Sequence, residues 1–366
     1  FNWLIVSKRL HRYSVKANNS ITLPDFFSNR FHEKKKVIMT LAAVFILVFF
    51  TVYASSCFVT CGKLFSALFG GNYVMWLIIG AIFVLIYTIL GGFLAESASD
   101  FMQAIVMVSA LTIIVIIGIV KAGGIGVIID NAREIPGFLE FFGIATPDVD
   151  GNDIQIVTNG VAQFKDAGSY GILSVASCLA WGLGYFGMPQ VLLRFMAIRK
   201  ENELKTSRRI AMVWVIISLA VAVFIGIMGR QLYLTGQLPA SEQLLTKSSS
   251  ENIFINLSTS FLPPILAGFV MAGILAATIS SSDSYLLIAA SSLSKNIFQG
   301  VINKKATDKQ VMFVSRVTLL ALTLVGVLLA LDEDSIIFDI VSFAWSGFGA
   351  TFGPLMIFSL FWKRTN

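Results

Sequence analysis

The chain has 366 residues, of which 56% are hydrophobic and only 13% are charged. This composition, with a mean hydropathy of +0.80, excludes a soluble globular protein and indicates many transmembrane helices. The sequence has three cysteines and two histidines, and its net charge is +6. An odd number of cysteines in apolar surroundings, with so few histidines, indicates neither a disulfide framework nor a zinc-type metal centre.

Long apolar runs predict eight complete transmembrane helices. Their approximate limits are residues 37–58, 74–94, 101–120, 171–193, 210–229, 264–294, 317–331 and 336–362. We expect residues 96–100 to form a short link, the polar segment 121–169 to form a loop with a short surface helix, and the polar segment 230–263 to form a loop with a short helix around residues 253–261. The prediction is an all-α polytopic helix bundle, with residues 1–366 in a single transmembrane domain. Residues 1–6 read as the tail of an earlier span, so we expect an excerpt from a longer protein.

Lysine and arginine gather in alternate loops of this layout. Of the 27 basic residues, 21 lie in the segments 8–36, 194–209, 295–316 and 363–364. Such a bias predicts that these loops face the cytoplasm. It also explains the basic runs as a topology signal, without a nucleic-acid partner.

Residues 181–189 are unusual for a membrane span. They read Trp-Gly-Leu-Gly-Tyr-Phe-Gly-Met-Pro, and three glycines with a proline form a poor helix. At membrane depth, freed backbone groups are tolerated only where protein or a water-filled cavity covers them. With Trp181 and Tyr185 one helical turn apart, the stretch predicts a binding site near the bilayer midplane, as in secondary transporters. The alternative is a kinked helix with ordinary packing glycines.

The sixth predicted span carries an uncommon number of polar groups. Residues 276–284 read Ala-Ala-Thr-Ile-Ser-Ser-Ser-Asp-Ser. Ala277 and Ser280 share a helix face with Ser281 alongside, and carbonyl and hydroxyl oxygens suit a small hard cation such as sodium. Back-bonding of hydroxyls or helix packing is the alternative. Asp283 strengthens the functional interpretation, because an ionisable group inside a span is by default a functional hypothesis.

Two further polar residues have two interpretations each. Asp100 precedes the third predicted span, where it fits either a helix N-cap or a functional carboxylate. Tyr87, in the second span, is either a buried tyrosine with a hydrogen-bond partner or a hydroxyl that lines a cavity.

Several motifs together resemble the sodium/solute symporter family over essentially the whole chain, and within it the bacterial sodium/proline symporters. The most similar stretch is residues 181–189, followed by Arg-Phe-Met-Ala at 194–197. The other motifs lie at residues 22–31, 87–95, 100–103, 276–281 and 342–350. The resemblance rests on their order and spacing rather than on any one motif.

This resemblance implies part of a 5+5 inverted-repeat (LeuT-like) transporter fold with discontinuous helices at the midplane. It implies sodium ligands at Ala277 (through its carbonyl), Ser280 and Ser281, and a carboxylate tied to sodium coupling at Asp100. It also implies a proline site lined by Tyr87, Trp181, Tyr185 and Pro189. Ser282 and Asp283 stand where the family leads us to expect small or hydroxyl residues. The family's first discontinuous helix would precede residue 1.

The implied function is sodium-coupled secondary active symport of proline into a bacterial cell, by alternating access across the plasma (inner) membrane. It requires Na⁺ as the coupling ion, a small-molecule substrate and a lipid bilayer, and it is not an enzyme activity. Alternatives are a symporter of the same family for pantothenate, a sugar or sialic acid, and the input module of a membrane sensor. A channel is less favoured because no filter repeat is visible. An enzyme is least favoured, because the spans show no set of nucleophile, general base and orienting group.

Overall fold

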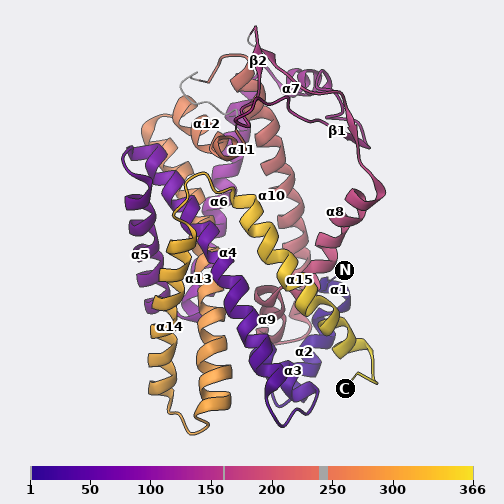
Figure 1. Ribbon diagram of the computed structural model, residues 1–366, viewed down its shortest axis with the longest axis vertical. Helices are drawn as coiled ribbons and strands as arrows, with labels where there is room; N and C mark the ends of the chain where they lie inside the picture. Colours follow the sequence, from indigo (N-terminus) through magenta and orange to yellow (C-terminus); the bar gives the residue numbers. More distant parts are fainter. Residues whose placement is uncertain (1, 160, 239–245, 366) are drawn as a thin grey trace.

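The computed structural model describes residues 2–159, 161–238 and 246–365. The predicted domain ends at residues 1 and 366, and part of the predicted 230–263 loop, lie outside these described residues. Figure 1 shows a bundle of long helices, with small β-hairpins at one end and the short helices α2 and α3 at the other.

Seven described helices are long and apolar enough to cross a membrane. They are α4 (Val37–Phe69), α5 (Tyr73–Gly91), α6 (Phe93–Lys121), α10 (Glu203–Leu234), α13 (Pro264–Ser291), α14 (Asp308–Leu329) and α15 (Ile337–Phe361). A bent pair, α8 (Ile172–Gly184) with α9 (Pro189–Ala197), provides an eighth crossing when it is counted as one span.

Several helices are longer than the predicted spans. α6 begins at Phe93, so residues 96–100 are helical and the predicted link is wrong. α4 continues to Phe69, and α13 leads without a break into the π-helical segment η2 (Ser292–Ile302). α14 begins at Asp308 rather than near residue 317. The physical reason is the same throughout: apolar runs mark only the part of a helix that matches hydrocarbon, whereas backbone hydrogen bonds continue into its polar ends.

The remaining elements are short and lie at the two ends of the bundle. On the side of the basic loops they are α1 (Asn2–Ile5), α2 (Ser7–Lys16) and α3 (Leu23–Arg30). On the other side they are α7 (Ile125–Arg133), β1 (Gly143–Ile144), β2 (Val157–Thr158), β3 (Val161–Ala162), β4 (Gly168–Ser169), α11 (Lys247–Ser250) and α12 (Ile253–Phe261). β1 pairs antiparallel with β4, and β2 with β3, so the predicted loop 121–169 contains a small β2–β3 hairpin enclosed in sequence by the β1–β4 ladder.

α13 lies at the centre of the packing. Its largest contacts are with α6 and α4, and it also touches α5, α9, α12 and α14. Many large apolar side chains on the outer helices are exposed, as expected for surfaces that face lipid. In the serine-rich segment of α13, Ser282, Asp283 and Ser284 are therefore buried in protein, whereas Ala277 is exposed and Ser280 and Ser281 are half-buried.

Candidate functional site

The stretch at residues 181–189 forms a broken helix. α8 ends at Gly184, a 3₁₀ turn (η1) spans Tyr185–Gly187, and α9 begins at Pro189, with a bend of 41°. Pro189 occupies the first turn of α9, where its missing N–H costs nothing. The side-chain amide of Asn2 donates to the Tyr185 carbonyl at 2.8 Å. The break is thus covered by protein, as a membrane setting requires.

The glycines of this stretch also have a packing role. A Cβ on Gly187 would lie 2.4 Å from the Phe348 carbonyl oxygen and 2.7 Å from the Gly353 nitrogen, both on α15. A Cβ on Gly349 would lie 2.9 Å from the Gly184 Cα. Residues 181–189 were interpreted either as a broken helix at a binding site or as a kinked helix with packing glycines. The two interpretations are compatible, because the break and the close approach of α15 involve the same residues.

Five aromatic residues from four α-helices and the η1 turn form a continuous group, which we call the aromatic cluster: Trp181 (α8), Tyr185 (η1), Trp345 (α15), Tyr53 (α4) and Tyr285 (α13). Ring centroids are 5.4 Å apart for Trp181 and Trp345, and 4.9 Å apart for Tyr185 and Trp345. The Trp345 indole N–H donates to the Tyr53 hydroxyl at 2.9 Å, and Tyr53 stacks on Tyr285 at 4.0 Å. The cluster connects the broken helix to the polar segment of α13.

Two cavities meet this cluster. The first, of about 410 Å³, is lined by Tyr53, Tyr285, Ala277 and Ser281 among others. The second, of about 570 Å³, lies between α8 and α15 and is lined by Trp181 and Trp345 among others. The hydrogen bond between Tyr53 and Trp345 joins the walls of the two cavities.

The three predicted sodium ligands lie together on α13. The Ser280 hydroxyl donates to the Ala277 carbonyl at 3.1 Å, which is the back-bonding geometry, and it places the two oxygens side by side. Ala277 and Ser281 line the 410 Å³ cavity. Neutral carbonyl and hydroxyl oxygens at the wall of a cavity fit a hard monovalent cation.

Asp100 belongs to a partly buried charge cluster between α6, α9 and α13. The Arg194 guanidinium lies 2.7 Å from an Asp100 carboxylate oxygen and 3.5 Å from Glu96. The Ser284 hydroxyl donates to Glu96 and accepts from Arg194 at 3.2 Å. Asp283 is 1% exposed; one carboxylate oxygen accepts from the Ser284 N–H at 2.7 Å, and the other has no partner among the described residues. Because α6 begins at Gly92 and Phe93, the N-cap interpretation of Asp100 is wrong.

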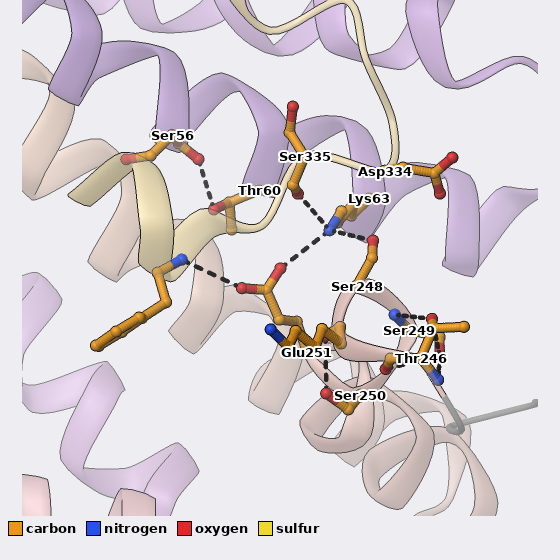
Figure 2. Close-up of polar contacts among 12 residues, drawn as sticks. Ser56, Thr60, Lys63, Thr246, Ser248, Ser249, Ser250, Glu251, Asp334 and Ser335 are labelled. Carbon is orange, nitrogen blue, oxygen red and sulfur yellow. Dashed lines mark hydrogen bonds and ion pairs between the residues drawn. The ribbon is translucent and has the colours of Figure 1, made fainter. Parts of the chain in front are cut away.

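A second buried charge lies at the opposite end of the bundle. The Lys63 ammonium, on α4, donates to Glu251 at 3.0 Å, to the Ser248 hydroxyl at 2.9 Å and to the Ser335 carbonyl at 3.0 Å (Figure 2). Glu251 also accepts from the Phe338 N–H at 3.3 Å. Lys63 therefore joins α4 to the α11–α12 segment and to the start of α15.

Sequence reasoning missed several of these residues. Tyr53 and Trp345 stand in apolar runs with no local signal, although Trp345 belongs to the motif at residues 342–350. Glu96 was assigned to a link and Arg194 to a basic loop, because their partners are distant in sequence. Tyr87, which was predicted, lies half-buried on α5 and is not among the residues that line either cavity.

Comparison with known proteins places the chain among transporters. The sodium:solute symporter family matches residues 1–366. The high-affinity proline transporter PutP of Bacillus subtilis is 40% identical over 365 residues, covering 99% of this chain and 70% of the relative. The sodium/proline symporter of Escherichia coli is 35% identical over 363 residues, covering 99% of this chain and 67% of the relative.

The fold is also found in a solved structure. A Na⁺-coupled sialic acid symporter in a substrate-bound outward-open state matches with a TM-score of 0.70 and 17% identity, covering 100% of this chain and 73% of that chain. This likeness confirms the LeuT-like fold expected from the sequence. The chain belongs to the sodium:solute symporter family.

Proposed function

We propose that this chain carries out sodium-coupled symport of proline by alternating access. Its relatives in B. subtilis and E. coli are proline transporters at 40% and 35% identity over nearly the whole chain. The observation that carries the proposal is the shared wall: Ala277 and Ser281 line the same cavity as Tyr53, which hydrogen-bonds the tryptophan packed on Trp181. An ion site and an aromatic site this close together can influence each other. Residues 1–366 act as one transporter domain in this proposal.

Ala277, Ser280 and Ser281 hold sodium in this scheme. Oxygen ligands without net charge bind a monovalent ion weakly enough to release it on the other side of the membrane. Asp100 adds a carboxylate whose charge is balanced by Arg194, and it thereby links the ion site to α6 and α9.

The aromatic cluster binds the ring of proline. Trp181, Tyr185 and Trp345 offer apolar faces, and Pro189 fixes the start of α9 beside them. The substrate's carboxylate and amine are met by the helix ends that the break creates, as at other broken helices in transporters.

Coupling requires only that sodium and proline each raise the other's affinity. The reciprocal free energy is typically about 1–3 kcal/mol. Since Tyr53 and Tyr285 of the aromatic cluster line the same cavity as Ala277, ordering of either side would stabilise the other.

The protein resides in the bacterial plasma membrane, in keeping with its family and its bacterial relatives. The basic loops are assigned to the cytoplasm, because 21 of the 27 lysines and arginines lie on that side of the bundle. The β1–β4 ladder and the β2–β3 hairpin then lie outside the cell.

Uptake of labelled L-proline by the full-length protein in liposomes tests this function. We expect uptake to require an inward sodium gradient. Ser280→Ala should raise the sodium concentration that gives half-maximal uptake. Trp181→Ala should raise the proline concentration that gives half-maximal uptake. Thr112→Ala, which changes a hydroxyl on α6 away from both cavities, serves as the control. Uptake of a different solute with the same sodium dependence would overturn the substrate assignment, and no sodium-driven uptake of any solute would overturn the symport function.

A further inference from the structure

A third cavity lies outside the site described above. It has a volume of about 260 Å³ and sits between α7, the β2–β3 hairpin and the end of α10. This is the end of the bundle that carries the hairpins, at the top of Figure 1. It is remote in the fold from the serine-rich segment of α13 and from the broken helix.

Arg230, on α10, lines this cavity without a charged partner among the described residues. Its guanidinium lies over the Phe164 ring, 4.5 Å from the centroid, and makes one long hydrogen bond of 3.4 Å to the Gln155 side chain. Its Nε atom is buried and has no described hydrogen-bond partner. The remaining N–H groups on its two terminal nitrogens have no described acceptor and can donate to a carboxylate.

Glu134 lines the same cavity and carries the opposite charge. It is exposed and forms no ion pair or hydrogen bond with any residue that the structure describes. Its neighbour Arg133 instead pairs with Asp130 at 3.1 Å. Among the described residues the cavity thus presents one cation and one anion without charged partners, and its lining also includes the apolar side chains of Ile128, Phe138 and Ala162.

We propose that this cavity binds a small zwitterionic amino acid, with its carboxylate on Arg230 and its ammonium group on Glu134. A ligand with both charges satisfies both side chains, whereas a simple anion would be repelled by Glu134 and a simple cation by Arg230. The volume equals that of roughly nine water molecules at about 30 Å³ each, which suits a ligand of about eight non-hydrogen atoms such as proline.

Proline as the natural occupant rests on the proposed function. With the basic loops inside the cell, the cavity opens toward the medium from which proline is taken up. Because the cavity shares no lining residue with the two cavities of the proposed transport site, binding there is tested directly rather than through uptake.

The test separates this cavity from the transport site by starting from Trp181→Ala. Equilibrium binding of labelled L-proline to the full-length protein in detergent, without sodium, is measured in that background. We expect saturable binding to remain. Addition of Arg230→Gln should weaken it at least tenfold, Glu134→Gln should weaken it severalfold, and Arg133→Gln, the matched control, should leave it unchanged.

Competition distinguishes the two contacts. Pyrrolidine, which lacks the carboxylate, and N-acetylproline, which lacks the ammonium group, should each compete poorly with L-proline. Glu134→Gln guards against misfolding, because its side chain holds no described partner and its loss should not alter the thermal midpoint.

Absence of saturable binding in the Trp181→Ala background would overturn the proposal, as would binding that is indifferent to both Arg230→Gln and Glu134→Gln. Either result would leave sodium-driven uptake by the wild type standing. Conversely, Arg230-dependent binding in a protein that takes up no proline would support the cavity and overturn the proposed function.

Discussion

Lys63 and Glu251 form an ion pair of 3.0 Å in which the lysine is only 6% exposed and the glutamate 20% exposed. They come from α4 and from the segment between α11 and α12, nearly two hundred residues apart in the sequence. The pair also holds Ser335 and the start of α15 (Figure 2). The ion pair and its hydrogen bonds thus connect three segments at the hairpin end of the bundle: α4, the α11–α12 segment and the start of α15.

Lys63→Met should destabilise the protein by about 3–5 kcal/mol, because it leaves a largely buried carboxylate without its cation. We expect a lower thermal unfolding midpoint and faster hydrogen exchange across α11 and α12. Lys63→Met combined with Glu251→Gln should recover part of the loss, since an uncharged amide can still accept from Phe338. Lys165→Gln, which breaks an exposed 4.0 Å pair with Asp148, is the control and should change stability little. An equal effect of both single variants would contradict the assigned role.

Tyr53→Phe should weaken proline binding about fivefold, since it removes one hydrogen bond worth about 1 kcal/mol to Trp345. The half-saturating sodium concentration at saturating proline should change much less. Tyr73→Phe is the matched control, because its hydroxyl also makes a buried hydrogen bond, to the Ala330 carbonyl at 2.8 Å, but outside the aromatic cluster. An unchanged proline affinity in Tyr53→Phe would remove Tyr53 from the site.

Gly187→Ala should destabilise the protein by about 1–3 kcal/mol, because the added methyl group would overlap the α15 backbone at Phe348. Gly182→Ala, in the same stretch, meets nothing within 4 Å and replaces a glycine inside α8. It should be neutral or stabilising by up to about 1 kcal/mol. Thermal unfolding of the two variants side by side checks this. Similar losses in both would mean that backbone freedom, rather than the close approach of α15, explains these glycines.

These cases show which parts of the structure local sequence patterns can specify. The spans follow from hydropathy, and the broken helix follows from glycine and proline, because both signals act over one or two helical turns. The position of Ala277, Ser280 and Ser281 on one helix follows from the helical period. All of these are properties of a single segment.

The sequence could not reveal partners that only the tertiary fold brings together. Nothing near Glu96 or Arg194 indicates that they meet, because they lie on α6 and α9 and the bundle must form first. Likewise, Tyr53 looks like any aromatic residue of an apolar span until Trp345 of α15 is placed beside it. The wrong link at residues 96–100 has the same origin, since polar residues that leave the hydrocarbon can still continue a helix.

The charge cluster around Arg194 offers the sharpest test of sodium coupling. Arg194 is 50% exposed, while Glu96 and Asp100 are 5% and 17% exposed. Arg194→Gln leaves two carboxylates close together without a described cation, so we expect a stability loss of about 1–2 kcal/mol, less than for a fully buried pair. Uptake should fall at least tenfold, because α6 and α9 would no longer be held at the ion site.

Substitutions of the two carboxylates should differ in their effect on the sodium dependence of uptake. Glu96→Gln keeps an oxygen that accepts from the Ser284 hydroxyl, so sodium dependence should change little. Asp100→Asn removes the charge proposed to act in coupling and should raise the half-saturating sodium concentration strongly. Arg199→Gln breaks an exposed 3.0 Å pair with Glu203 and is the control. If Glu96→Gln alone shifted the sodium dependence, the coupling role would belong to Glu96, because Asp100 would then act only as the partner that neutralises Arg194.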